Sequence, residues 1–270
     1  ALQLLLISVV VLPLLPDRGY GPWQAINPYR LWWLVVLIAG IAFVGHFSTR
    51  LVGAKRGILL TGFFGGLASS TALTLNFARM GREHPALHGV LATGVILAGG
   101  TVFPRMLFEV GVINRALLPR AGIALGTMAV VTYLAALAGW LATRRRTVSD
   151  SAEGGQAFQL GIALKFAALL AVISLLSEAM RAWFGDAGIY ALALVSGIGD
   201  VDAITLSLAH MARQSLAPEV AVTAMVIAAV TNTVVKAGMV LFIARGRMAL
   251  VVGLVAVLVA TTGIVVVLIL

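Results

Sequence analysis

Charged residues and cysteine are scarce in this 270-residue sequence. Only 11% of the residues are charged and none is cysteine, whereas an ordinary soluble domain carries about 25% charged residues. The lack of cysteine excludes disulfides, thiolate metal sites and a cysteine nucleophile. Hydrophobic residues make up 61% of the chain and the mean hydropathy is +1.05. This composition excludes a water-soluble globule and a disordered regulator, and it predicts a polytopic membrane protein surrounded by the lipid bilayer.

The basic residues lie mostly between apolar segments. The net charge of +9 therefore has the distribution of membrane-flanking charges, and we expect no nucleic-acid partner. About nine apolar segments are candidates for membrane-spanning helices. They are residues 1–15, 31–49, 57–78, 86–112, 121–142, 158–180, 188–211, 220–244 and 249–270. The predicted fold is an all-α, multi-pass transmembrane bundle, expected in the inner cell membrane.

The chain divides into four parts. Residues 1–30 hold the first apolar segment and a proline-rich interfacial connector. Residues 31–146 form a first half, residues 147–156 a polar linker, and residues 157–270 a second half.

The two halves resemble each other when the sequence is shifted by 131 positions. Gly66 then aligns with Gly197, and Arg105 aligns with Lys236, without a gap. Internally repeated halves are typical of transporters that bind substrate at the interface of the repeats. Four spans in each half would give both halves the same orientation in the membrane, whereas a single re-entrant or miscounted span would make the repeat inverted.

Two carboxylates lie far inside an apolar segment. Asp200 and Asp202 are 12 and 14 residues into segment 188–211, which corresponds to a depth of about 18–21 Å. The other eight carboxylates, Glu109 among them, lie near span ends or in loops. A charge at the bilayer centre costs at least about 2.5–3.5 kcal/mol, so Asp200 and Asp202 need a partner, a proton or a cavity.

A helix break is predicted at these acids and at the matching place in the first half. Side chains at i and i+2 of a regular helix point to different sides, so both carboxylates share one cavity only if the backbone is extended there. The glycines that favour the two breaks are Gly65, Gly66, Gly197 and Gly199. Ser69 and Thr71 align with Asp200 and Asp202. A broken membrane helix is tolerated where it is buried in protein or lines a cavity.

Further polar side chains complete a candidate ion site around the two acids. The oxygen donors are Ser69, Ser70, Thr71, Asn76, Thr205 and Asn232, and the coupling or counter-charged residues are Arg105, Lys165 and Lys236. Other interpretations stay open. The hydroxyls of membrane helices often bond a carbonyl of their own helix or join helices together, basic residues extend to the interface, and the acids are alternatively paired permanently with the lysines.

The string Gly197-Ile-Gly-Asp200 matches the GxGD pattern of intramembrane aspartyl proteases. That chemistry requires a second carboxylate from a different span, and no other span holds an aspartate at mid-depth. No Pro-Ala-Leu string follows Asp200 either. The sequence therefore predicts that the chain is not an enzyme.

Four strings carry a family resemblance: residues 57–79, 163–176, 196–209 and 232–238. They resemble the C-terminal membrane domain, itself of unknown function, of MgtC/SapB-family proteins. The resemblance implies a bacterial or archaeal membrane protein concerned with ions. It also implies that a smaller MgtC-like domain precedes this one in the full-length protein. The first apolar segment begins at Ala1 in the middle of a hydrophobic run, as expected for a piece of a longer protein.

Three functional hypotheses follow. The first is a transporter or channel for an inorganic cation, with Asp200 and Asp202 as metal ligands and Mg²⁺ as the kind of hard cation that oxygen ligands suit. The second is a regulatory membrane module that transports nothing. The third is a transporter of an anion or a small organic molecule, which would use the three basic residues. Whether the chain forms a homo-oligomer is left open.

Overall fold

The computed structural model describes residues 10–22, 26–33, 35–36, 58–143 and 160–270. Apart from a single bridge between Tyr20 and Ile26, the regular structure of these residues is helical. Residues 28–33 and 35–36 are α-helical. The α-helices from residue 58 onward are α3 (Ile58–Glu83), α4 (His88–Gly100), α5 (Val102–Ile113), α6 (Leu118–Thr143), α7 (Leu160–Gly199), α8 (Asp202–Met211), α9 (Pro218–Ile243) and α10 (Gly246–Ile269). Short 3-10 helices occur at Leu12–Leu14, Pro85–Leu87 and Arg115–Leu117.

Five helical stretches of the described residues are long and apolar enough to cross a membrane. They are Pro85–Ile113, Arg115–Thr143, Pro218–Ile243 and Gly246–Ile269, together with Ala171–Gly199, which is interrupted by a turn at Gly185. The predicted all-helical, multi-pass character is therefore supported. The predicted segments 1–15 and 31–49 lie largely outside the described residues.

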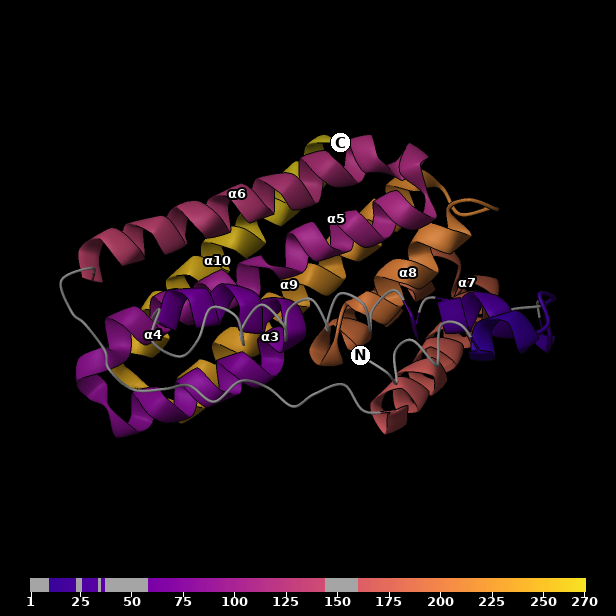
Figure 1. The fold of residues 1–270 in the computed structure, drawn as a ribbon. Coiled ribbons are helices and arrows are strands. Elements are labelled where there is room, and N and C mark those ends of the chain that lie inside the picture. Colours follow the sequence, from indigo (N-terminus) through magenta and orange to yellow (C-terminus); the bar gives the residue numbers. More distant parts are fainter. Residues whose placement is uncertain (1–9, 23–25, 34, 37–57, 144–159) are drawn as a thin grey trace.

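The long helices run between two ends of the molecule (Figure 1). At the first end, the start of α4 lies beside the start of α10 and the end of α6. A Cβ added at Gly246, the first residue of α10, would lie 3.4 Å from His88, the first residue of α4. A Cβ added at Gly89 of α4 would lie 2.7 Å from Thr143, the last residue of α6. At the second end Arg213, after α8, donates to the carbonyl of Ile113. Helices α4 and α5 thus run from the first end to the second, and α6 returns.

The ends of α9 and α10 fix their directions too. Glu219, at the start of α9, pairs with Arg120 near the start of α6, so α9 begins at the second end. Helix α10 begins at the first end, beside His88, and runs towards the second end. The pair α4–α5 and the helix α9 therefore run in opposite directions, and so do α6 and α10.

Helix α3 is a hairpin of two helical arms. Ser69 has φ −165° and ψ 96°, which is extended backbone. A Cβ added at Gly65 would lie 3.2 Å from Leu73, although residues eight apart in a straight helix are separated by about 12 Å. We call Ile58–Glu83 the first hairpin and residues 69–71 its tip.

The packing of the first hairpin on α4 confirms that its arms are antiparallel. Gly62 faces Gly94 and Gly66 faces Ala98, so the first arm runs parallel to α4. Gly81, in the second arm, lies close to His88 at the α4 start. Both ends of the first hairpin are therefore at the first end of the molecule.

A second hairpin follows a turn inside α7. Gly185 has φ 59° and ψ −141°, a conformation that favours glycine, and a Cβ added at Gly188 would overlap the carbonyl of Met180. The chain therefore doubles back at Gly185, runs to Gly199, breaks, and continues as α8. Arg181 donates to Ser215, beyond the end of α8. We call residues 186–211 the second hairpin and residues 200–202 its tip.

These hairpins correct two expectations. Segments 57–78 and 188–211 were each expected to cross the membrane once, but each is folded back at its tip. Arms of 10 to 14 residues are about 15–21 Å long, which is roughly half of the ~30 Å hydrocarbon core. Composition does not distinguish one full crossing from two half crossings.

Two apolar clusters hold the helices around the hairpins. Phe77, Leu91 and Met248 join the first hairpin to α4 and α10. Phe103, Met128 and Ile204 join α5, α6 and α8. All six side chains are less than 2% exposed, so each hairpin is enclosed by packed helices along part of its length.

Candidate functional site

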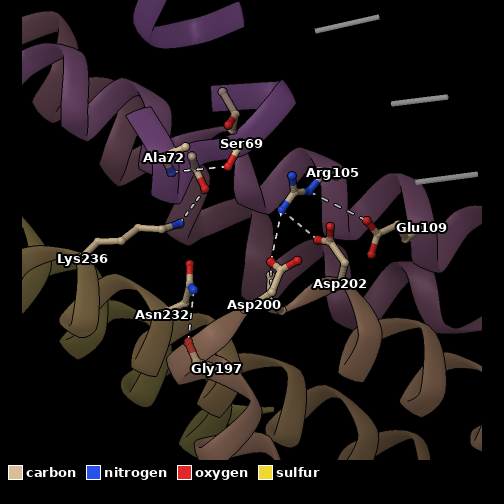
Figure 2. A network of polar contacts seen from close by, with 12 residues as sticks. Ser69, Ala72, Arg105, Glu109, Gly197, Asp200, Asp202, Asn232 and Lys236 are labelled. Carbon is tan, nitrogen blue, oxygen red and sulfur yellow. Dashed lines mark hydrogen bonds and ion pairs between the residues drawn. The ribbon is translucent and has the colours of Figure 1, made fainter. Parts of the chain in front are cut away.

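Asp200 and Asp202 meet Arg105 at the tip of the second hairpin (Figure 2). Asp202 is the first residue of α8, and Asp200 lies in the break before it. Nη2 of Arg105, on α5, is 2.8 Å from Oδ1 of Asp202 and 3.6 Å from Oδ1 of Asp200. Asp200 also accepts a hydrogen bond of 2.8 Å from the backbone N–H of Val201. The break thus lets both carboxylates approach one guanidinium.

Glu109 is a third carboxylate of this cluster, although its position in the sequence predicted a place near the end of a span. It is 0% exposed, and its Oε1 lies 3.9 Å from Nε of Arg105, one helical turn earlier. The sequence held one indication of this contact: Arg105 and Glu109 are four residues apart, and residues at that spacing are neighbours on the surface of a helix. Neither oxygen of Glu109 accepts a hydrogen bond from any of the described residues.

Lys236 reaches the tip of the first hairpin. The Lys236 side chain comes from α9, and the residue is 5% exposed. Its ammonium donates a hydrogen bond of 2.7 Å to Oγ of Ser70. Arg105 and Lys236 occupy aligned positions in the two halves of the sequence, and each contacts the hairpin of the other half.

Asn232 hydrogen-bonds to the C-terminal end of α7, the helix that leads to Asp200. Its Nδ2 donates a hydrogen bond of 3.1 Å to the carbonyl of Gly197, which is one of the last carbonyls of α7. A carbonyl at a helix C-terminus has no partner within its own helix. The Nδ2 of Asn232 thus joins the second hairpin to α9, while the expectation that its amide oxygen binds an ion stays a prediction.

The remaining predicted oxygen donors differ in position. Ser69 is exposed at the first tip, where its Oγ accepts the N–H of Ala72 at 3.3 Å. Thr71 is half-buried beside it, and Asn76 is exposed further along the same arm. Thr205 is 0% exposed and lies one turn after Asp202 on α8.

Several buried polar atoms around the second tip have no hydrogen-bond partner among the residues that the structure describes. They are Arg105 Nε, Glu109 Oε1, Glu109 Oε2, Ser196 Oγ, Asp202 Oδ1 and Thr205 Oγ1. Three of these six atoms are carboxylate oxygens, which accept hydrogen bonds and bind cations. Asp202 Oδ1 is within ion-pair distance of Arg105 but lacks the geometry of a hydrogen bond. The unbonded polar atoms around this tip therefore include more hydrogen-bond acceptors than the neighbouring donors satisfy, and the acceptors belong to negatively charged groups.

Two predictions about the site have no test in these contacts. Lys165 lies in α7, but its side chain is outside the described part of the structure. Across the described ranges, no three His, Cys, Asp or Glu residues form a group that could hold a metal ion. Asp200 and Asp202, predicted as metal ligands, both lie close to the guanidinium of Arg105.

The fold and the site define a class of protein: an all-helical, multi-pass membrane protein in which two broken hairpins bring charged residues together inside the bundle. The chain belongs to the family described as Domain of unknown function (DUF4010), which it matches over residues 36–244.

A relative from Aquifex aeolicus (strain VF5), described as an uncharacterized protein, is 29% identical over 187 residues, or 67% of this chain and 80% of the relative. No solved structure matches the chain. Neither match links the chain to MgtC/SapB proteins.

Proposed function

We propose that this protein is a membrane transporter that binds an inorganic cation at the tip of the second hairpin. The observation that carries the proposal is the set of carboxylates at the break. The Asp200 side chain is 41% exposed, and buried oxygens of Asp202 and Glu109 lack hydrogen bonds within the described ranges. Ionised groups inside a membrane protein mark ion pathways more often than packing contacts.

Charge counting within the cluster favours a cation over an anion at this tip. Asp200, Asp202 and Glu109 surround the single guanidinium of Arg105. If all four are ionised, their net charge is −2, and a bound cation or proton would reduce it. Arg105 then acts as an internal competitor, since an arriving cation displaces it from Asp200 or Asp202.

We further propose that the two halves are repeats inverted in the membrane. Support comes from the opposite directions of α4–α5 and α9, from those of α6 and α10, and from hairpins that open at opposite ends. Broken helices that meet between inverted repeats are a recurrent arrangement in transporters. An inner-membrane location, an upstream MgtC-like domain and self-association stay predictions.

Flux through the purified protein in liposomes tests the cation site. Separate assays would follow Mg²⁺, Na⁺, K⁺ and protons with ion-sensitive dyes. We expect one of these ions to move, and we expect Asp200→Asn and Asp202→Asn each to reduce its flux about tenfold or more, because each removes one charge from the site.

Asp186→Asn is the matched control, since Asp186 is an exposed aspartate at the outer end of the same hairpin. Its flux should equal that of the wild type. A double variant, Asp200→Asn with Asp202→Asn, that transports at the wild-type rate would exclude the proposed site. A regulatory module without transport predicts no flux of any ion in the wild type.

A further inference from the structure

Among the residues that the structure describes, none places an opposite charge next to the ammonium of Lys236. The residue is 5% exposed, and its ammonium donates a hydrogen bond of 2.7 Å to the hydroxyl of Ser70. Within the described part of the chain, no carboxylate lies within 4.0 Å of it; Asp200, Asp202 and Arg105 act on it only from further away. A buried charge without an adjacent opposite charge is costly in a protein interior.

Arg105, the residue aligned with Lys236 in the other half, has the carboxylate partners that Lys236 lacks among the described residues. Arg105 faces Asp200 and Asp202, which belong to the tip of the second hairpin. Lys236 faces the tip of the first hairpin, where the residues aligned with the two acids are Ser69 and Thr71. The chain itself therefore supplies the negative charge at one tip, whereas hydroxyls occupy the same positions at the other tip.

The first tip carries hydrogen-bond donors suited to an anion. Ser70 accepts from Lys236, so its own hydroxyl hydrogen is left for a further acceptor. The Ser69 hydroxyl accepts the N–H of Ala72 and likewise keeps its hydrogen. The arm from Ser70 to Glu83 begins here, and the first N–H groups of a helix and its dipole favour negative charge.

We propose that Lys236, Ser69 and Ser70 form a binding site for an oxyanion, that is, a carboxylate or phosphate group of the transported solute. This proposal rests on the proposed function in one respect: the solute binds at the first tip while the cation binds at the second. The transporter would then couple the movement of a cation to that of an anionic solute. Lys236 supplies the charge and the two serines supply directional hydrogen bonds.

Thermal unfolding of the purified full-length chain in neutral detergent tests the oxyanion site. The probes are phosphate, sulfate and succinate, each compared with chloride at equal ionic strength. A further arm adds phosphatidylglycerol, which distinguishes a lipid phosphate from a free anion. Stabilisation by a ligand increases with RT ln(1 + [L]/Kd). We expect at least one oxyanion to raise the melting temperature of the wild type.

Variants test whether stabilisation by the oxyanion depends on the tip of the first hairpin. Lys236→Met should weaken the apparent affinity for that oxyanion about tenfold or more, since it removes the charge that assists the hydrogen bonds. Lys236→Arg should retain most of the response, and Ser70→Ala should weaken it, which keeps the test valid if Lys236→Met does not fold. Arg79→Met, at an exposed position of the same hairpin, should respond like the wild type.

The outcomes separate this inference from the proposed cation site. If cations stabilise the wild type through Asp200 but no oxyanion does, the oxyanion site is wrong and the cation site stands. The same conclusion follows if an oxyanion stabilises Lys236→Met and the wild type equally. If oxyanions act through Lys236 but no cation acts through Asp200, the cation site is wrong.

Discussion

At the scale of single residues, Arg105 is the positive charge closest to the acids of the second tip. Its guanidinium lies within 4.0 Å of Asp200, Asp202 and Glu109. A planar guanidinium with five donors suits several carboxylates at once better than a lysine ammonium does. Among the described residues, its loss would leave Asp202 with only the more distant Lys236 as a counter-charge.

Replacing Arg105 by methionine should therefore destabilise the folded protein. Breaking a buried ion pair from one side costs about 3–5 kcal/mol, and a cation bound to the vacated acids should recover part of the loss. We expect the melting temperature of Arg105→Met to be well below that of the wild type and to depend more strongly on added cations. Thermal unfolding in detergent, with and without Mg²⁺ or Na⁺, measures both effects.

Arg115→Met is the control for this experiment, because Arg115 is exposed just beyond the end of α5. We expect its melting temperature to match that of the wild type. Equal stability of Arg105→Met and Arg115→Met would show that Arg105 is not needed to neutralise the acids.

At the scale of elements, close helix packing holds the hairpins in place. A Cβ added at Gly197 would lie 2.8 Å from Cβ of Thr231 and 3.0 Å from Cα of Ala228, both on α9. Asn232 on the same helix bonds the carbonyl of Gly197. The second hairpin thus contacts α9 through its backbone, which only glycine permits at this distance.

Gly197→Ala should consequently separate the second hairpin from α9. Overpacking of this kind costs about 1–3 kcal/mol, and it should also weaken the hydrogen bond from Asn232. Gly199→Ala is the matched variant, since a Cβ at Gly199 would have no atom within 4 Å. We expect Gly197→Ala alone to lower the melting temperature; a similar decrease in both variants would contradict this packing.

At the scale of the whole molecule, the two hairpins open at opposite ends. The first hairpin ends at Glu83, next to the start of α4. The second ends near Gln214, in the connection between α8 and α9 at the other end of the bundle. If the long helices cross the membrane, these two positions lie on opposite sides.

The absence of cysteine makes this arrangement directly testable. Glu83→Cys and Gln214→Cys each introduce a single thiol at an exposed position of a cysteine-free chain. A membrane-impermeant maleimide should label one variant from outside intact cells and the other only after the membrane is opened. The unmodified chain should take up no label, and labelling of both variants from the same side would exclude inverted halves.

Much of the site was predictable because membrane proteins restrict where polar residues lie. The depth of Asp200 and Asp202 and the neighbouring glycines indicated a polar break in the second half, and the alignment of Ser69 with Asp200 indicated its counterpart. Glu109 was missed because its position near the end of an apolar segment suggested an interface. Burial by the surrounding helices, which sequence spacing does not report, makes it part of the cluster.

The sequence alone determined that the chain is helical and lies in a membrane, since its low charge and long apolar segments leave few other ways to satisfy the backbone. Only the tertiary structure decided that two apolar segments fold back on themselves and that Arg105 contacts Asp200 and Asp202, while Lys236 contacts Ser70. These partners are 95 to 166 residues apart in the chain. Their pairing depends on how whole helices pack, and neither hydropathy nor local spacing contains that information.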